Sequence, residues 1–499
     1  MKPELFPEDI RDRILPEAGG DLRYDCLKCG GSFPPDALHY TCPACGGLLL
    51  LRDHAEGRLR ERPGSWWRRL FDHRLMANSQ ALRGVFCYHE FLAPLIPLED
   101  VVYLGEAHTP AVKAPEPLEK EVGAPFFVKL DGLNPSASFK DRGMAAALSF
   151  VRHLVRVQGK RGVMAVCAST GDTSAAAALY SASLGGAVRA AVLLPRGYVT
   201  PQQLSQPLGA GASVFELPGV FDDCMKVVER LSEDYDVVLL NSKNPWRVLG
   251  QESYAFEVAQ QFDWETGDLV LFVPVGNAGN ITAILGGLLK LHRAGVIERL
   301  PRVTAVQSER ANPVFRYYSA APGSRSYEPV KVRPSVAQAA MIGDPVSFPR
   351  LAWLAQEYEA ARGPGAFQAV EVTEQDIMDS MILANRTGLT VCTQGGESLA
   401  GLRAALAAGL VLPGETAVLD STAHALKFME FQNAYFRGEL AADYGVSSRP
   451  GNVNAPRALE LPGIGLPAQG KTLTPEERSV FTVAAARAIA SALGLAPKS

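Results

Sequence analysis

This sequence has no excess of charge of either sign. Its 499 residues include 49 Lys and Arg against 53 Asp and Glu, which leaves a formal net charge of -4. A balance of this kind offers no general attraction to a polyanion. The sequence therefore predicts no nucleic-acid partner and no binding to a charged membrane surface.

Long hydrophobic runs are also absent. No uninterrupted apolar stretch approaches the roughly 20 residues that cross a bilayer, and the first ten residues, MKPELFPEDI, lack the apolar core of a secretory signal. We therefore expect a soluble, cytoplasmic protein with no membrane partner. The composition, with 47% apolar and 20% charged residues, is typical of a folded globular protein. The length exceeds a single hydrophobic core, so two or three domains are expected.

Cysteine is scarce as well. Eight cysteines in 499 residues are too few for a disulfide scaffold. Four of them lie singly among apolar neighbours, which favours buried structural thiols over catalytic ones: Cys87, Cys167, Cys224 and Cys392.

The other four cysteines cluster near the N-terminus as Cys26-x2-Cys29 and Cys42-x2-Cys45. Each Cys-x2-Cys pair with its following Gly forms a tight turn that presents two thiolates to one ion, and two such turns complete a tetrahedral zinc site. Because cysteine fills all four positions, the zinc would be structural rather than catalytic. We expect a zinc ribbon over residues 22–52. The alternative is a ribbon that keeps its fold without the metal.

Residues 53–99 are basic and contain two tryptophans, in RLRERPGSWWRRLFDHRL. This composition suggests either a nucleic-acid patch or an amphipathic connector helix with solvated arginines. The acidic N-terminus and the overall charge favour the helical connector.

From about residue 100, short β-branched runs alternate with segments of helical length. The runs are continuously apolar, as expected for strands buried on both faces of a parallel sheet. The expected strands are 162–168, 188–195, 212–218, 236–242, 268–276, 302–308, 367–373 and 416–422. The pattern predicts an α/β protein.

One compact domain rarely holds so many strands, so we expect two open, twisted α/β lobes with a cleft between them. The large lobe would comprise residues 100–145 and 266–430, and the small lobe residues 146–265. Residues 431–499 would form a C-terminal extension, in which a Pro- and Gly-rich connector leads to a final helix capped by Thr474.

The segment NPSASFKDRG, residues 134–143, contains an unusually placed lysine. Ser138 would cap a helix, and Asp141 would lie in its first turn, where an acidic side chain is favoured. Lys140 has no such reason to be there, because a cation in the first turn opposes the helix dipole.

Two expected strands end in turns suited to anions, which is where open α/β sheets bind ligands. After the strand at 162–168, a turn rich in hydroxyl groups leads into a helix and offers backbone N–H groups to a carboxylate: Ser169, Thr170, Gly171, Asp172 and Thr173. Ordinary helix capping by Asp172 or Thr173 explains the same residues equally well.

After the strand at 268–276 comes a glycine-rich turn that forms a phosphate cradle: Gly276, Asn277, Ala278, Gly279 and Asn280. It matches neither the P-loop nor the dinucleotide-binding pattern, so a small phosphate ester is the better ligand. A third strand runs into Ser421, Thr422 and His424. His424 could be a general base, but a structural role is favoured.

A phosphate cradle gives Lys140 a use. A nucleophilic amine needs a lowered pKa, which burial beside Phe139 and the positive end of a helix both supply. An anchored phosphate and a reactive amine together are what a pyridoxal phosphate site requires.

Several motifs resemble the threonine synthases, a family of fold-type II pyridoxal phosphate enzymes related to the tryptophan synthase β subunit. NPSASFKDRG is similar to their N-P-T-G-S-F-K-D-R-G segment, and LGEAHTPAV (104–112) to L-G-E-G-x-T-P-L. NSKNPWRVLGQESYAFE (241–257) matches N-S-x-N-P-x-R-x-x-G-Q-x-x-x-A-F-E, and STAHALKF (421–428) resembles S-T-A-H-x-x-K-F. The resemblance extends over about residues 22–430 and includes the cysteine pattern.

The resemblance implies a lyase that converts O-phosphohomoserine and water to threonine and phosphate, with its cofactor in the cleft between the lobes. Lys140 would form the Schiff base with pyridoxal phosphate and move protons, residues 276–280 would hold the cofactor phosphate, and Thr422 would bind the pyridine nitrogen. Residues 169–173 would bind the substrate carboxylate. Ser136 and Ser138 would lie near the substrate phosphate. A homodimer is common in this fold and is expected.

Some positions depart from the family. Asp172 stands where many fold-type II enzymes have Asn beside the cofactor's 3′-oxygen, so a shared proton or a turned-away side chain would be needed. Ala137 replaces Gly. Residues 341–350 and 392–402 match only loosely and bear on the substrate. The alternatives are a paralogue such as cysteate synthase or an amino-acid β-eliminase, and a non-catalytic threonine-synthase-like binding protein.

Overall fold

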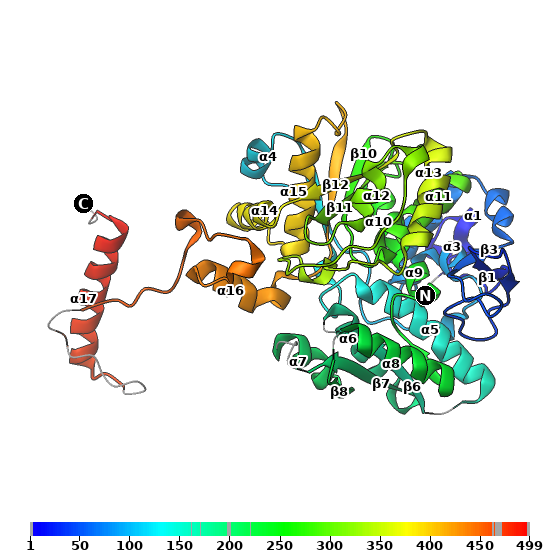
Figure 1. Cartoon of the computed structure of the whole chain (residues 1–499), viewed down its shortest axis with the longest axis horizontal. Coiled ribbons are helices and arrows are strands. Elements are labelled where there is room, and N and C mark those ends of the chain that lie inside the picture. Colours follow the sequence, from blue (N-terminus) through cyan, green and yellow to red (C-terminus); the bar gives the residue numbers. More distant parts are fainter. Residues whose placement is uncertain are drawn as a thin grey trace. The chain divides into compact units, whose positions relative to one another are not determined.

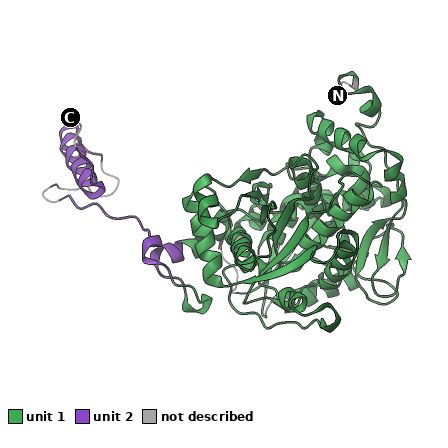
Figure 2. Ribbon diagram, turned by 90° about the horizontal axis from the view of Figure 1, so that it is seen from above, with its two compact units in different colours: residues 1–432, 441–447 green, residues 433–440, 448–499 purple. Residues whose placement is uncertain are grey.

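The computed structural model describes residues 3–160, 162–169, 171–196, 201–219, 221–461, 464 and 472–496, with the backbone alone at 201–203 and 221–222. The chain divides into two compact units (Figure 2). Unit 1 comprises Met1–Gln432 and Ala441–Ser447, and unit 2 comprises Asn433–Leu440 and Ser448–Ser499. Among the described residues, no helix combines the length and the apolar character needed to cross a membrane.

Unit 1 begins with a small antiparallel sheet in the order β2-β1-β3. Its strands are β1 (Leu22–Cys26), β2 (Ser32–Phe33) and β3 (Leu49–Asp53), and η1 (Pro3–Leu5) and α1 (Glu8–Arg11) precede them. The hydroxyl of Tyr24 in β1 accepts a 2.7 Å hydrogen bond from the indole N–H of Trp246. Both residues are fully buried, so this bond fastens the small sheet to the body of unit 1.

The segment after β3 is helical and packs into the core. Trp66, Trp67 and Phe71 of its longest helix are buried. The expectation of solvated arginines is wrong for Arg74, which is fully buried and donates to both carboxylate oxygens of Glu90 at 2.5 and 2.6 Å. The elements are η2 (Glu56–Glu61), α2 (Gly64–Met76), η3 (Gln80–Leu82), η4 (Val85–Tyr88), α3 (His89–Leu92) and η5 (Leu98–Asp100).

The large sheet has six strands in the order β12-β11-β10-β13-β5-β4. Figure 1 labels β10, β11 and β12 of this sheet. All neighbours are parallel except β4 and β5, which are antiparallel. The strands are β4 (Ala111–Lys113), β5 (Phe126–Leu130), β10 (Leu269–Pro274), β11 (Arg302–Ser308), β12 (Phe367–Val372) and β13 (Thr416–Ser421). β10 is buried throughout and pairs with β11 and β13, so it lies at the centre.

Helices of the large sheet follow its strands in the alternation that the sequence predicts. They are α4 (Glu116–Val122), η6 (Asp131–Leu133), α10 (Ser253–Gln261), α11 (Gly279–Arg293), α12 (Pro313–Ser319), η8 (Pro322–Ser324), η9 (Gln338–Ala340), α13 (Phe348–Arg362), α14 (Glu374–Arg386), α15 (Thr393–Ala407), η10 (Ala425–Phe428), α16 (Met429–Arg437) and η11 (Ala442–Tyr444). α15 contacts four of the five parallel strands, β10 to β13.

The small sheet is parallel, with four strands in the order β8-β7-β6-β9 (Figure 1). Its strands are β6 (Val163–Ala168), β7 (Val188–Pro195), β8 (Ser213–Leu217) and β9 (Val237–Leu239). The accompanying helices are α5 (Lys140–Gln158), α6 (Asp172–Ala182), η7 (Gly185–Ala187), α7 (Pro201–Gly209), α8 (Phe221–Asp234) and α9 (Pro245–Gln251).

The expected fold class is confirmed. Each of the eight expected strands is present within a few residues of its predicted bounds, and they form two separate sheets. The sequence does not predict β4 or β5. The domain boundaries at 52, 99, 145, 265 and 430 stay predictions.

Unit 2 contains the end of α16, η12 (Pro450–Asn452) and α17 (Pro475–Leu493). The expected cap of the last helix is confirmed, because the Thr474 hydroxyl accepts from the backbone N–H of Glu477. The Glu477 carboxylate in turn accepts from the backbone N–H of Thr474, which completes a capping box.

Helices α5 and α9 cross at two glycines. A Cβ on Gly143 would lie 2.8 Å from the carbonyl oxygen of Arg247, and a Cβ on Gly250 would lie 2.3 Å from the carbonyl oxygen of Arg142. The crossing therefore depends on the absence of side chains at both positions. It brings the first turn of α5, which begins at Lys140, against α9.

Replacing Gly250 by Ala should destabilise the chain by about 1–3 kcal/mol, because the added methyl group forces the two helices apart. Chemical unfolding at a fixed cofactor concentration measures the change. Gly209→Ala in α7 is the matched control, since no atom lies within 4 Å of the added Cβ. This control should be neutral or up to about 1 kcal/mol more stable. Equal effects of the two variants would contradict the close crossing.

Candidate active site

The turn after β10 presents backbone N–H groups at the start of α11. α11 begins at Gly279, and its N-cap residue Ala278 adopts the left-handed region with φ of 61°. No described side chain caps this helix, so its first N–H groups are free to bind an anion. A Cβ on Gly276 would lie 3.0 Å from Ala340 Cα, so η9 approaches this turn as closely as a glycine allows. The segment predicted to bind phosphate has the backbone that such a site requires.

The end of the turn is linked to the neighbouring strand. Asn280 donates a 2.7 Å hydrogen bond from Nδ2 to Asp420 of β13. Burial raises the pKa of Asp420 well above its usual range, and the nearby Asp131 carboxylate adds to the effect. Oδ1 of Asn280 and Oδ1 of Asp420 are buried and have no hydrogen-bond partner among the described residues. This pair therefore holds the turn after β10 beside the end of β13.

Lys140 is placed by the residues that follow β13. The backbone N–H of Phe139 donates to the carbonyl oxygen of Thr422 at 2.9 Å, and Ser138 forms a β-bridge with Ala423. The Lys140 amine lies 3.7 Å from the centre of the Phe139 ring. Because β13 and β10 are neighbours, Lys140, Thr422 and the turn at 276–280 meet at one edge of the large sheet.

The pKa of the Lys140 amine is lowered to about 7. Its main cause is burial of the amine, and the positive charges of Arg247 and Lys427 act in the same direction. The carboxylates of Asp172 and Asp420 oppose the shift. Lys140 as a whole residue is half-buried.

The residues before Lys140 are held by the residue after it. Asp141 accepts hydrogen bonds from the hydroxyl and the backbone N–H of Ser136, at 2.5 and 2.6 Å. Burial raises the pKa of Asp141 to about 7, against the effect of these bonds. Between them, Ala137 adopts a left-handed φ of 66°, a conformation that favours glycine.

The expected cap at Ser138 is wrong. Phe139 is the N-cap residue of α5 and no described side chain caps the helix. The Ser138 hydroxyl accepts a long bond of 3.4 Å from the backbone N–H of Lys140, and the residue forms a β-bridge with Ala423. Ser136 and Ser138 are fully buried beside Lys140, and their contact with a substrate phosphate stays a prediction.

Arg142 holds the first turn of α5 in place through buried ion pairs. Its guanidinium donates to Asp131 at 2.7 and 2.9 Å and to both oxygens of Glu257. Lys129 of β5 donates to Glu257 at 2.7 Å, and all four side chains are fully buried. Although burial opposes it, the two cations hold the pKa of Glu257 well below its usual range. A charged, fully paired network therefore anchors the first turn of α5, which contains Lys140.

The turn after β6 forms the start of α6. Asn241 clamps the end of β6, with hydrogen bonds to the N–H and the carbonyl oxygen of Ala168 at 3.0 and 2.7 Å. The Ser169 hydroxyl accepts from Gly171 N at 3.2 Å. Thr173 lies in the first turn of α6 and is buried. Thr170, also predicted to bind the substrate carboxylate, lies outside the described residues.

Asp172, the first residue of α6, is paired with a lysine that the sequence analysis does not identify. The amine of Lys427 lies 2.9 Å from an Asp172 carboxylate oxygen. The need for a shared proton or a turned-away side chain beside the cofactor's 3′-oxygen stays a prediction. His424 Nδ1 accepts from Leu426 N at 3.2 Å and caps η10, which agrees with a structural role for His424.

Arg247 is a second residue that the sequence analysis does not single out. It is buried, its Nη1 donates to Leu240 O at 2.9 Å, and its Nε has no partner among the described residues. Burial lowers the pKa of Arg247 to about 10. A buried, incompletely paired cation that acts on Lys140 is suited to a substrate anion. Its position in the NPWR motif was the available signal.

The start of α15 carries further polar groups without partners. The Thr393 hydroxyl and both polar atoms of the Gln394 side chain are buried and make no hydrogen bond with a described residue. A Cβ on Gly395 would lie 2.7 Å from the Ser421 hydroxyl, so this turn packs directly against the end of β13. It belongs to segment 392–402, which departs from the family pattern.

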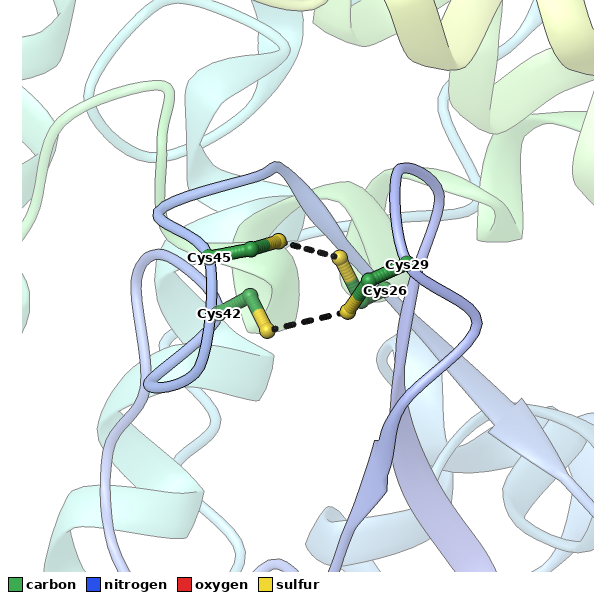
Figure 3. A group of neighbouring side chains, drawn as sticks. All are labelled: Cys26, Cys29, Cys42 and Cys45. Carbon is green, nitrogen blue, oxygen red and sulfur yellow. Dashed lines mark hydrogen bonds between the residues drawn. The ribbon is translucent and has the colours of Figure 1, made fainter.

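The four N-terminal cysteines converge (Figure 3). Their sulfur atoms all lie within 4.8 Å of one another, with 3.5 Å between Cys26 and Cys45 and 3.6 Å between Cys29 and Cys42. Each pair lies in a turn closed by a backbone bond from a glycine N–H, 3.0 Å to Cys26 O and 2.8 Å to Cys42 O. The other four cysteines are buried, as predicted.

Comparison with known proteins agrees with this site. The family model described as pyridoxal-phosphate dependent enzyme matches residues 102–420. The chain is 36% identical to a threonine synthase of Methanocaldococcus jannaschii, over 81% of this chain and 92% of that protein. It is 34% identical to the chloroplastic threonine synthase 2 of Arabidopsis thaliana, over 81% and 76%.

Among solved structures, the crystal structure of threonine synthase from Escherichia coli covers 86% of this chain and 93% of its own, with a TM-score of 0.63. At 23% identity this likeness shows the fold. The matched family model and the long alignments at 34–36% identity show the family. The chain belongs to the pyridoxal-phosphate-dependent enzymes and, within them, to the threonine synthase family.

Proposed function

We propose that this chain converts O-phospho-L-homoserine and water to L-threonine and phosphate, with pyridoxal phosphate as its cofactor. The observation that carries the proposal is the amine of Lys140, whose pKa is lowered to about 7 and which lies at the same edge of the large sheet as the uncapped start of α11. Family membership supports the same chemistry.

The residues present fit the cofactor. The free N–H groups of residues 276–280 would bind its phosphate, and Thr422 would face its ring nitrogen. The partnerless Asn280 and Asp420 oxygens beside them are consistent with a site built for a polar ligand. When bound, pyridoxal phosphate supplies an electron sink that acidifies the C–H bonds near the substrate's amino group.

Lys140 would hold the cofactor and then act as the acid–base group. An amine with a pKa near neutrality can both accept and return a proton at the pH of the cell. The reaction needs such a group repeatedly, since protons leave Cα and Cβ and return to Cα and Cγ. Phosphate departs from Cγ, and water supplies the hydroxyl group at Cβ.

Arg247 would bind the phosphate of the substrate, and the start of α6 its carboxylate. Arg247 is a buried cation whose charge acts on Lys140 and whose Nε has no partner among the described residues, so a doubly charged phosphate would complete its hydrogen bonds. Ser169 and Thr173 flank the helix start at Asp172, where backbone N–H groups attract anions. Placing the two anions apart would orient Cα, Cβ and Cγ across Lys140.

We also infer that Cys26, Cys29, Cys42 and Cys45 bind a structural zinc ion. Four thiols in two glycine-containing turns match the donor set and geometry of such sites. The ribbon packs on α9 through the Tyr24–Trp246 hydrogen bond. Assembly as a homodimer and location in the cytoplasm stay predictions.

The activity is tested by following phosphate release and threonine formation from O-phosphohomoserine. We expect turnover from the purified chain and none from Lys140→Ala, which should also lose the visible cofactor band. Sulfite-dependent phosphate release from O-phosphoserine tests the paralogue alternative. A chain that works on O-phosphoserine alone would contradict the proposal, and a chain that binds no cofactor would contradict it entirely.

Uptake of pyridoxal phosphate by the cofactor-free chain should follow the charge of Lys140. Because only the neutral amine attacks the aldehyde, the rate should rise with pH through a midpoint near 7, the pKa of this amine. Stopped-flow absorbance measures the rate. A midpoint near about 10.4, the ordinary value for lysine, would show that burial does not activate the amine.

Metal analysis of the purified chain should find one zinc ion per molecule. Cys29→Ser should lose it and unfold at a lower temperature, because a ribbon of this size depends on its metal. Cys224→Ser, which changes a buried thiol in α8, is the control and should retain the zinc. Zinc-free protein with unchanged thermal stability would show that the cysteines serve the fold without metal.

A further inference from the structure

Lys427 lies in η10, the short helix after β13, and forms an ion pair with Asp172, the first residue of α6. Among the described residues of the site, no other ion pair joins these two elements. Its amine lies 2.9 Å from Asp172, and the two side chains are only 15% and 8% exposed. Such a pair interacts more strongly than one on the surface, because little water screens it.

Contacts with neighbouring residues hold η10 in place. Phe428 packs in a buried cluster with Cys392 and Ala423, and Gln432 donates to Ala425 O at 3.1 Å. Lys427 therefore projects from a fixed segment of the large sheet's side of the site. α7, from the small sheet's side, also contacts η10.

Both charges of the pair act on the Lys140 amine. Asp172 raises the pKa of this amine and Lys427 lowers it, while burial, the largest effect, lowers it as well. The other titratable groups that act on the amine are Arg247 of α9 and Asp420 of β13. Removing either partner of the pair would leave its opposite uncompensated beside Lys140.

Asp172 also lies where a negative charge would hinder the substrate. It is the first residue of α6, at the helix start proposed to bind the substrate carboxylate. An ionised, unpaired carboxylate there would repel that anion. The helix dipole favours an acidic residue such as Asp172 in the first turn of α6, whereas the substrate carboxylate would be repelled by it. A cation close to Asp172 reconciles the two effects.

We propose that Lys427 is a positioning residue of this active site: by pairing with Asp172 it holds the start of α6 against η10 and cancels a carboxylate charge that would repel the substrate and act on Lys140. The substrate part of this inference rests on the proposed function, whereas the charge effect on Lys140 requires only the bound cofactor.

The test compares K427M, K427R, D172N and the double variant K427M/D172N as full-length holoenzymes. The first readout is the pH titration of the visible band of the lysine-bound cofactor without substrate. In K427M the unpaired Asp172 should stabilise the protonated nitrogen and move the midpoint up by about 0.5–1 pH unit. In D172N the unpaired Lys427 should move it down by a similar amount, and K427R should resemble the unchanged chain.

The second readout separates KM from kcat with the phosphorylated substrate. K427M should raise KM by about tenfold with a smaller change in kcat, since substrate binding meets an uncompensated carboxylate. K427M/D172N should recover most of this loss, because the repelling charge is gone. Lys160→Met is the control, since Lys160 forms a 2.7 Å pair with Asp236 whose side chains are 42% and 74% exposed.

The proposal fails if the midpoints of K427M and D172N move in the same direction or do not move. It also fails if the double variant is as defective as K427M. If K427M does not fold, the downward shift in D172N and the unchanged midpoint of K427R still decide the matter. Opposite shifts in a chain that makes no threonine would support the role of Lys427 and contradict the proposed function.

Discussion

The pairing of Arg142 with Asp131 and Glu257 is the constraint on which the active site depends. Arg142 follows Lys140 by two residues, and its buried guanidinium binds two carboxylates from outside α5. Breaking such a network by removing one partner costs about 3–5 kcal/mol, because it leaves a buried charge unpaired. A rotation or shift of the first turn of α5 would break it. The lysine is thus held by charges that take no part in the chemistry.

A second set of polar groups acts on the Lys140 amine itself, and some of their hydrogen-bonding atoms have no partner among the described residues. Arg247 keeps a free Nε, Asp420 keeps a free oxygen, and the Asp172–Lys427 pair cancels internally. The anchoring network is fully paired, whereas this inner set leaves binding capacity for a ligand. The division explains how a chain with so many buried charges can be both stable and reactive. It also makes Lys140 sensitive to small changes in its neighbours.

The small N-terminal sheet, β1 to β3, packs against the helices that position the site. Trp246 stacks on Phe150 of α5 with 3.8 Å between ring centres and donates to Tyr24 of β1. Arg350 of α13 donates to Leu49 O of β3 at 2.8 Å. Through these contacts the ribbon supports α9, which crosses α5 at two glycines and carries Arg247. A cysteine cluster far from Lys140 in sequence therefore belongs to the segment that supports the helix of Arg247, the residue proposed to bind the substrate phosphate.

The sequence alone determined the α/β class, the eight strands with continuous apolar runs, the Thr474 cap and the convergence of four cysteines, because each depends on local periodicity or fixed spacing. It could not determine β5, whose Lys129 interrupts the apolar pattern and finds its partner, Glu257, on α10. Nor could it determine that Asp172 is paired with Lys427, 255 residues away, or that Arg247 is left with a free Nε. Those properties are relations between distant segments, and only the folded chain brings the charges close enough to interact.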